Sequence, residues 1–269
     1  MTKIKGSNVL ITGGGSGIGR IMGGIVLEKG AKSLVIWDVN EKNMADTKAE
    51  LDNKGNVYTQ RVDVSNPESV KEAAKVATKE CGQIDIVINC AGIVANNNTF
   101  DKQSTQDIVR TMNINATAPM LVTAEFLSGM IERDFGHVCN IASAAGMISN
   151  PRMSVYAASK WAVVGWSDSV RLELKQMKSN VHFSTLAPYY INTGMFDGVS
   201  SRFFPILKPV PTAKKIIKAI EKNRNFKGIP FGFHFIRICQ GLLPTFLFDF
   251  IFGEVVGIFH GMDNFKGRK

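Results

Sequence analysis

Cysteine is scarce in this 269-residue sequence, which contains only Cys81, Cys90, Cys139 and Cys239. They form no CxxC pair and have no histidine at metal-ligand spacing, so the pattern excludes a disulfide framework and a zinc site. An apolar leader is also absent, because the polar start of the sequence runs directly into a strand pattern at Asn8. We therefore expect a cytoplasmic protein that is not exported and holds no metal.

A long uninterrupted hydrophobic run is missing as well. The apolar segment that begins at Ile229 is broken by three charged residues and two prolines, namely Arg237, Asp249, Glu254, Pro230 and Pro244. No clean span of about 20 apolar residues remains, so we expect that this segment does not cross a bilayer. It can instead cover a lipophilic pocket, lie peripherally on a membrane, or form the interface of a homodimer or homotetramer. The alternation of its phenylalanines, from Phe231 to Phe252, resembles a strand more than a helix.

Acidic residues are outnumbered, with 23 Asp and Glu against 32 Lys and Arg, and the formal net charge is +9. The basic residues are scattered and form no Lys/Arg run with interleaved aromatics, so we exclude nucleic acid as a partner. Solvated helix faces explain most of this charge, while anionic ligands and an acidic membrane surface stay open.

Short runs rich in Val and Ile alternate with longer segments of helical periodicity. The predicted strands are Asn8 to Thr12, Ser33 to Trp37, Val57 to Val62, Ile84 to Asn89, His137 to Ala142 and Val181 to Ala187. Such alternation predicts an α/β fold, a Rossmann-type doubly wound parallel sheet with helices on both faces. We expect a single domain over residues 1–269, with a basic amphipathic helix near Thr212 to Asn223. Within this domain, residues from about 190 to 262 are expected to supply a substrate loop, a helix and an apolar C-terminal lid or interface.

A glycine-rich motif, TGGGSGIG from Thr12 to Gly19, follows the first predicted strand and opens a helix. Glycines allow a tight turn and the close approach of backbone to a pyrophosphate at a helix N-terminus. Asp38 ends the second strand, where a carboxylate accepts hydrogen bonds from both adenosine ribose hydroxyls and repels a 2′-phosphate. The motif therefore predicts NAD in preference to NADP, although Arg20 leaves NADP open. A helix N-cap is the alternative role of Asp38.

Tyr156 and Lys160 share one face of a predicted helix in the motif YAASK, and Ser143 follows the strand before it. A cation beside a phenol stabilises phenolate, so we expect Lys160 to lower the pKa of Tyr156. Tyr156 can then exchange the proton of an alcohol/ketone pair, while Ser143 orients the reacting oxygen and Lys160 also holds the nicotinamide ribose.

The motifs TGGGSGIG, NCAG (Asn89 to Gly92) and YAASK, together with Ser143, resemble the short-chain dehydrogenase/reductase family over Ser7 to about Met195. The resemblance implies an oxidoreductase that acts on CH–OH groups. It also implies that Asn115 organises a proton relay toward Lys160, with Asn113 as the fallback. The cofactor residues that the motifs and the resemblance imply together are Gly13, Gly15, Ser16, Gly17, Ile18, Gly19, Asp38, Asp63, Val64, Asn89, Ala91, Gly92, Tyr156, Lys160, Pro188, Ile191 and Thr193. Among them Asp63 and Val64 would flank the adenine, Asn89 would steady the central strand, and Thr193 would meet the carboxamide.

Two further stretches, PYYINTGMFDG at Pro188 to Gly198 and the ending MDNFKGR, resemble the branch that contains retinol and 17β-hydroxysteroid dehydrogenases. This implies a secondary alcohol or ketone on a lipophilic skeleton, such as a steroid, a retinoid or a fatty chain. Tyr189 stands where the family usually has glycine, which predicts an aromatic ring against substrate or nicotinamide. Three alternatives stay open: an NADPH-dependent 3-oxoacyl thioester reductase, a non-catalytic NAD-binding regulator, and a lipid-surface binding protein, which the +9 charge and the phenylalanine-rich tail suggest.

Overall fold

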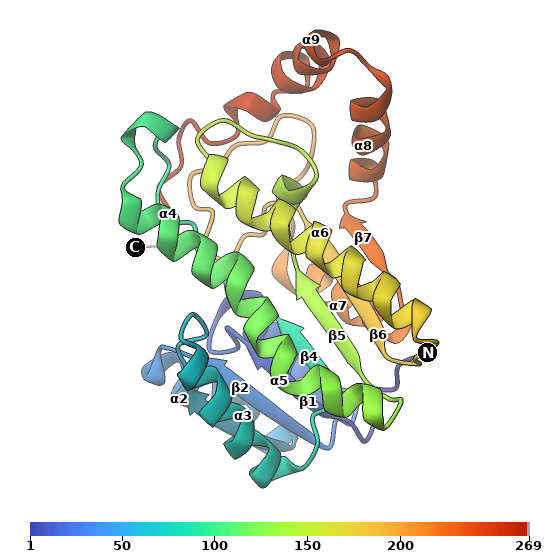
Figure 1. Ribbon diagram of the computed structural model, residues 1–269. Coiled ribbons are helices and arrows are strands. Elements are labelled where there is room, and N and C mark those ends of the chain that lie inside the picture. The colour runs from blue at the N-terminus through green and yellow to red at the C-terminus, as the bar shows by residue number, and fades with distance from the viewer. Residues whose placement is uncertain (268–269) are drawn as a thin grey trace.

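A parallel sheet of seven strands forms the centre of the computed structural model, which describes residues 1–267 (Figure 1). The strands are β1 (Asn8–Thr12), β2 (Ser33–Asp38), β3 (Asn56–Arg61), β4 (Ile86–Asn89), β5 (His137–Ile141), β6 (His182–Pro188) and β7 (Phe226–Ile229). Their order is β3-β2-β1-β4-β5-β6-β7, and every neighbouring pair is parallel. The predicted doubly wound sheet is confirmed, with the strand order reversing between β1 and β4. Residues 268 and 269 of the predicted domain lie outside the described residues.

Helices cover both faces of the sheet because successive strand residues point to opposite sides. Val9 and Ile11 of β1 pack with one set of helices, and Leu10 packs with the other. The first set is α1 (Gly17–Glu28), α2 (Glu41–Leu51) and α7 (Pro209–Glu221), and the second is α3 (Pro67–Cys81), α4 (Thr105–Met112), α5 (Ala118–Glu132) and α6 (Ser154–Gln176). The predicted basic helix is therefore α7.

Local caps start three of these helices. The side chains of Asn40, Asn66 and Ser104 each accept a hydrogen bond from the backbone N–H three residues later. Polar side chains of this kind satisfy N–H groups that have no partner inside the helix. The alternative role of Asp38 as an N-cap is thus taken by Asn40.

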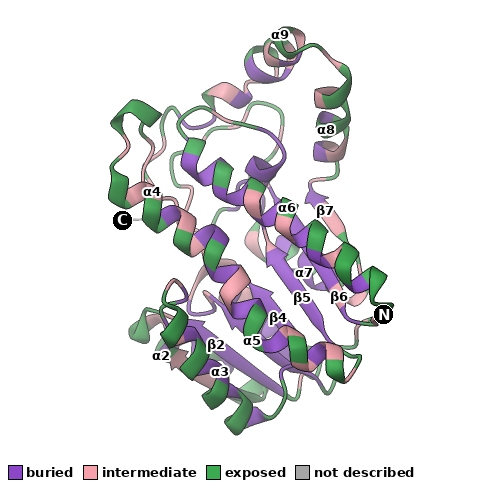
Figure 2. Ribbon diagram, viewed as in Figure 1, coloured by how far each residue is buried: buried purple, intermediate pink, exposed green. Residues whose placement is uncertain are grey.

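The chain from Phe226 onward differs from the sequence prediction. β7 was not predicted, and the phenylalanine-rich segment is helical: it forms α8 (Gly232–Leu242), α9 (Thr245–Phe248) and a π-helical stretch, Asp249–Val255. The strand predicted from the alternating phenylalanines is wrong, because apolar side chains occupy both the buried and the exposed side of these helices. Phe233 and Phe248 are buried while Phe235 and Phe246 face solvent, as Figure 2 shows for the two helices that rise above the sheet.

One helical stretch, Thr105–Glu132, is long and apolar enough by length and composition to cross a membrane. It comprises α4, a π-helical turn and α5, and it packs on α3 and α6. Core helices of globular proteins share this length and composition.

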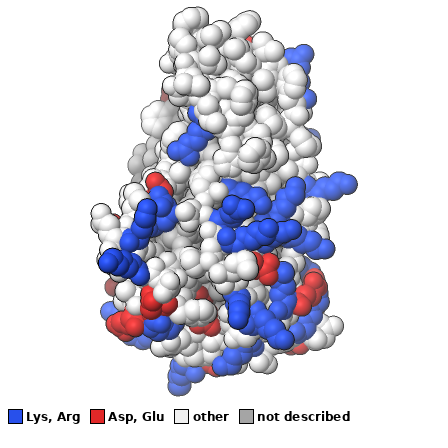
Figure 3. Space-filling view, turned by 90° about the vertical axis from the view of Figure 1, so that its right-hand side faces the viewer, with Lys and Arg blue, Asp and Glu red and all other residues white. Residues whose placement is uncertain are grey.

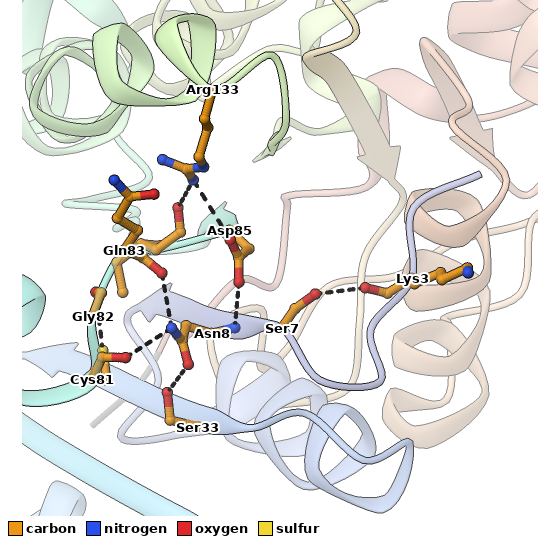
Figure 4. Close-up of polar contacts among 10 residues, drawn as sticks. Lys3, Ser7, Asn8, Ser33, Cys81, Gly82, Gln83, Asp85 and Arg133 are labelled. Carbon is orange, nitrogen blue, oxygen red and sulfur yellow. Dashed lines mark hydrogen bonds and ion pairs between the residues drawn. The ribbon is translucent and has the colours of Figure 1, made fainter.

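Polar side chains tie the amino ends of the strands together (Figure 4). The Asn8 amide donates to the carbonyl oxygens of Cys81, at 2.8 Å, and Gln83, at 2.9 Å, and accepts from the Ser33 hydroxyl at 2.8 Å. Asp85 accepts from the Asn8 backbone N–H at 2.9 Å and lies 3.6 Å from the Arg133 guanidinium. These bonds satisfy buried polar atoms and lock β1, β2 and the start of β4 in register.

Candidate active site

The glycine-rich turn lies between β1 and α1 and lines a cavity of about 620 Å³ at the carboxyl ends of the strands. Gly13 and Gly17 have positive φ angles of +68° and +54°, which residues with a side chain rarely adopt. A Cβ on Gly13 would lie 2.8 Å from the Ala91 Cα, and one on Gly19 would lie 2.3 Å from the Gly13 carbonyl oxygen. Only glycine fits these positions, so the turn has the close backbone approach that a pyrophosphate at the start of α1 requires.

Asp38 lies beside this turn at the end of β2. Its carboxylate accepts hydrogen bonds from the backbone N–H groups of Gly15 and Asn40, both at 3.0 Å, and it lines the cavity. Arg20, the cation that left NADP open, forms an ion pair with Glu50. The negative charge at the ribose end of the cavity is therefore held in place, and the neighbouring positive charge is already paired.

Most of the predicted cofactor residues surround this single cavity. Those that line it are Gly13, Ser16, Gly17, Ile18, Gly19, Asp38, Asp63, Val64, Ala91, Gly92, Tyr156, Lys160, Pro188, Ile191 and Thr193. Gly15 does not line the cavity, but its backbone N–H donates a hydrogen bond to the Asp38 carboxylate, which does. Because the residues come from β1, β2, β4, β5 and β6 and the loops after them, the cavity crosses the point where the strand order reverses.

Asn89 is not a lining residue of the cavity. Its amide nitrogen donates to Asn140 at 2.8 Å and to Thr123 at 3.1 Å, so it links β4 to β5 and α5 inside the core. The predicted role in steadying the central strand fits this position, whereas direct contact with a cofactor does not. Thr12 has a related role that the sequence reasoning missed, since its hydroxyl accepts from the backbone N–H groups of Cys90 and Ala91.

Several further lining residues were also missed. Arg110 of α4 and Ile114 of the π-helical turn after it lie one helical turn apart, and Tyr189, Met195 and Phe196 follow β6. The spacing of Arg110 and Ile114 could have indicated a common face toward the cavity. No such signal marks Met195 and Phe196, because their position depends on how the loop after β6 folds back.

Ser143, Tyr156 and Lys160 meet at one end of the cavity. Ser143 follows β5, and the other two lie on the first turns of α6, all three buried. The Lys160 ammonium is 5.7 Å from the centre of the Tyr156 ring and donates to the Ile141 carbonyl oxygen at 3.0 Å. The hydroxyl of Ser143 hydrogen-bonds Tyr156. The three predicted side chains are thus brought together by the end of a strand and the start of the following helix.

Burial decides the proton affinities of this group. It raises the pKa of Tyr156 to about 12, with the Ser143 hydrogen bond acting in the opposite direction, and it lowers the pKa of Lys160 to about 8. The expectation that Lys160 lowers the pKa of Tyr156 is therefore wrong for this structure. The reason is that removal from water outweighs the other influences on the phenol, while the ammonium is directed to a backbone carbonyl.

Asn115 lies in the π-helical turn Asn113–Thr117 between α4 and α5 and is fully buried, whereas the fallback Asn113 is exposed. Its amide accepts from the Ile93 N–H and donates to the Ile93 carbonyl, both at 2.8 Å, and donates to Ser159 at 3.2 Å. A Cβ on Gly92 would lie 3.3 Å from its oxygen and 3.6 Å from the Lys160 ammonium. Asn115 and Lys160 therefore flank the same glycine, and the π-helical turn is of the kind often found at functional sites.

The rest of the cavity wall near Tyr156 is aromatic. Phe196 meets the Tyr156 ring edge-on at 6.0 Å, and Tyr189 packs on Tyr190 at 4.4 Å and on Phe233 at 5.0 Å between ring centres. Tyr189 lines the cavity, as the sequence predicted for this aromatic residue. Apolar rings beside two polar hydroxyl groups are typical of a pocket that orients one oxygen of a lipophilic molecule.

The family model for short chain dehydrogenases matches residues 7–202. The chain belongs to this family. Among its relatives, epidermal retinol dehydrogenase 2 of Mus musculus is 33% identical over 273 residues, which cover 99% of this chain and 87% of the relative. Estradiol 17-beta-dehydrogenase 11 of Homo sapiens is 33% identical over 243 residues, covering 90% of this chain and 80% of the relative.

Solved structures agree with this membership. A short-chain dehydrogenase/reductase from Burkholderia phymatum, determined in complex with NAD, superposes with a TM-score of 0.81 and 26% identity, covering 90% of this chain and 95% of that one. Levodione reductase superposes with a TM-score of 0.76 and 26% identity, covering 85% of this chain and 97% of that one. The short-chain dehydrogenase described here is thus an oxidoreductase that interconverts alcohols and carbonyl compounds and binds NAD(H).

Proposed function

We propose that this short-chain dehydrogenase interconverts a secondary alcohol and a ketone, or an alcohol and an aldehyde, on a lipophilic skeleton such as a steroid, a retinoid or a fatty chain. The observation that carries the proposal is one cavity with Asp38 at one end and Ser143, Tyr156 and an aromatic wall at the other. The names of the retinol and estradiol dehydrogenases among its relatives support the same class of substrate.

The proton chemistry is assigned to four residues. Ser143 donates a hydrogen bond to the reacting oxygen. The Tyr156 hydroxyl gives its proton to that oxygen during reduction, and the Tyr156 phenolate takes the proton back during oxidation. Lys160 holds the nicotinamide ribose, and Asn115 orders the water that connects Lys160 to solvent. When bound, the nicotinamide supplies or accepts the hydride. The pKa of about 12 leaves Tyr156 protonated at neutral pH, which suits it to act as the proton donor in ketone reduction.

NAD(H) is proposed as the preferred cofactor over NADP(H). The Asp38 carboxylate faces the ribose end of the cavity, where it would repel a 2′-phosphate, and Arg20 is engaged by Glu50. The same observations count against an NADPH-dependent 3-oxoacyl thioester reductase, which would share the other motifs. Family membership with the complete set of Asn115, Ser143, Tyr156 and Lys160 counts against a non-catalytic regulator.

The test is to follow the absorbance of reduced nicotinamide with NAD or NADP and a panel of steroid, retinoid and aliphatic alcohols. Wild type, Tyr156→Phe and Tyr190→Phe are compared, because Tyr190 is a buried tyrosine of the same aromatic cluster whose hydroxyl bonds Asn150 at 2.8 Å. We expect NAD-dependent turnover that falls by about 10²-fold or more only in Tyr156→Phe. Turnover that survives in Tyr156→Phe would contradict the assigned proton donor, and turnover with NADP alone would contradict the role of Asp38.

Assembly and location remain predictions. A homodimer or homotetramer, and a cytoplasmic protein peripheral to a membrane, are consistent with the exposed apolar residues near the C-terminus. Light scattering of the purified protein measures the number of subunits, and fractionation of cells into membranes and supernatant measures the location.

A further inference from the structure

Helices α8 and α9 present a continuous apolar face to solvent. Six side chains along it have exposed fractions from 60% to 82%, namely Phe231, Phe235, Ile238, Leu242, Phe246 and Phe250. Within each helical stretch they recur every three or four residues, which places them on one side of that stretch. No charged residue occurs between Arg237 and Asp249. A contiguous exposed patch of this kind marks a surface that binds something apolar.

The fold itself does not need this outward face. The inward side of the same helices is already buried through Phe233, Ile236, Phe248 and Phe252, which form a cluster with Ala187 and the partly buried Tyr189. The segment is therefore apolar toward the protein and apolar toward solvent. Burying the inward side fixes the helices on the enzyme, and the outward side is left available for a partner.

Basic residues gather next to this apolar face. Burial lowers the pKa of Lys227 of β7, and the nearby charges of Lys215 and Lys218 of α7, of Lys222 at its end and of Arg224 act in the same direction. The acidic residue of α7, Glu221, is paired with Lys29 at 2.9 Å. Figure 3 shows Lys and Arg side chains in a belt below the mostly uncharged upper part of the molecule, where α8 and α9 lie. The surface thus combines an apolar tip with a positive belt, a combination that fits anionic lipid.

We propose that the outward face of α8 and α9 inserts into an anionic lipid surface while the basic cluster on α7 and β7 lies against lipid phosphates, so that the substrate enters the cavity from that surface. This inference rests on the proposed lipophilic substrate, and it identifies the lipid surface as the source from which that substrate reaches the cavity. The exposed side chains of Phe203 and Ile206 extend the apolar face along the loop after β6. The neighbouring Phe204 ring packs 4.8 Å from Phe233 and 6.0 Å from Tyr189, which lines the cavity.

A second copy of the chain is the competing occupant of this face. Two-fold pairing through α8 and α9 would use the same surface on both copies. Each copy would carry the same basic cluster beside the shared face, and like charges on two partners disfavour their association. An anionic lipid surface neutralises the same cluster, so the charge pattern favours lipid.

Sedimentation with vesicles tests the docking face directly. Full-length protein is mixed with phosphatidylcholine vesicles that contain or lack phosphatidylserine, as wild type and as Phe235→Ser/Phe246→Ser. The matched control is Val109→Ser/Leu172→Ser, which removes two exposed apolar side chains from α4 and α6. We expect the vesicle partition coefficient to fall by about tenfold or more in the first variant and to stay unchanged in the control. Equal partition of all three proteins would overturn the proposal.

The basic cluster is tested with Lys218→Gln/Lys222→Gln. Because the attraction is electrostatic, we expect binding of this variant to vesicles with phosphatidylserine to fall to the level seen with phosphatidylcholine alone and to lose its salt sensitivity. Binding to phosphatidylcholine alone should not change. If both lysine changes leave binding to anionic vesicles intact, the assigned orientation is wrong.

Kinetics separate this inference from the proposed function. A secondary alcohol dissolved in vesicles and a short water-soluble one are offered to the wild type and to the phenylalanine variant. We expect a higher KM for the vesicle-borne alcohol in the variant and the same KM for the soluble one. Absence of turnover with both alcohols in both proteins would count against the proposed function instead. A variant that turns an oligomer into a monomer without changing vesicle binding would show that a second copy occupies the face.

Discussion

The two ends of the parallel sheet both bury polar side chains, but they use them differently. At the amino ends, Thr2 and Ser184 each bond a ring nitrogen of His137, at 2.7 Å and 2.8 Å, within a network of protein partners. At the carboxyl ends, Asp38, Tyr156 and Lys160 face a cavity of about 620 Å³. Groups that bond one another hold strands in register, whereas groups that face a cavity can bond a ligand.

A shifted pKa does not by itself distinguish the two ends. Burial lowers the pKa of His137 to about 3, and burial also lowers the pKa of Lys160 to about 8. The difference is that His137 has protein partners on both ring nitrogens while Lys160 lines the cavity. A perturbed pKa therefore indicates function only where the group can reach a ligand.

The largest effect is expected from Lys160→Met, which removes the charge at the carboxyl end and keeps a side chain of similar length. We expect kcat/KM for NAD to fall by about 10² to 10⁴-fold with little loss of stability, because burial of the ammonium is itself unfavourable. In the wild type, kcat/KM for NAD should decline as pH rises through about 8, where Lys160 loses its proton. The measurement is a pH profile of both proteins, and a decline that persists in the variant would point to another group.

Asp38→Asn should have the next largest effect. The amide keeps the side chain's size but loses the negative charge, so we expect kcat/KM for NAD to fall by about tenfold to a hundredfold while use of NADP improves. Arg20→Gln is the control, because Arg20 is already paired with Glu50. Equal losses with NAD and NADP in Asp38→Asn would mean that the carboxylate supports the glycine-rich turn without selecting the ribose.

Asn8→Ala tests the amino end of the sheet. It deletes bonds to Cys81, Gln83 and Ser33, so we expect the free energy of unfolding in urea to fall by about 1–3 kcal/mol with an unchanged KM for NAD. The exposed Asn56, which donates to the Lys32 carbonyl at 3.3 Å, provides the control Asn56→Ala. If folded Asn8→Ala protein shows a raised KM for NAD, the amino ends of the strands also contribute to cofactor binding, which contradicts the proposed difference between the two ends.

The smallest effect at neutral pH is expected from His137, whose contribution to stability changes only in acid. Its folded-state pKa of about 3 lies below the ordinary value of 6.5, so the unfolded chain takes up a proton in this range and the folded chain does not. His137 therefore lowers the stability as pH falls from 6.5 toward 3, by about 1.4 kcal/mol per pH unit at most. Urea unfolding at several pH values should show a smaller decline of the unfolding free energy in acid for His137→Asn. The control is His260→Asn, which should not make this decline smaller, because hydrogen bonds to Glu254 and Asp263 raise the pKa of the exposed His260.

The sequence by itself determined the sheet, the glycine-rich turn and the positions of Ser143, Tyr156 and Lys160. These features depend on local patterns: alternating strands and helices, a turn that only glycine can form, and two residues one helical turn apart. Because parallel strands end at a common edge, the order of the motifs along the chain was enough to bring them to one cavity. Six of the seven strands were located within about two residues for the same reason.

Tertiary structure alone decided how the same residues are surrounded. Burial raised the pKa of Tyr156, the Lys160 ammonium found a backbone carbonyl as its hydrogen-bond partner, and the Asn89 side chain was placed in the core between β4 and α5. The helical form of the phenylalanine-rich segment was also decided there, because a segment that is apolar on both sides has no periodicity that separates strand from helix. Desolvation and packing depend on residues that are distant in the sequence, so no local pattern could have predicted them.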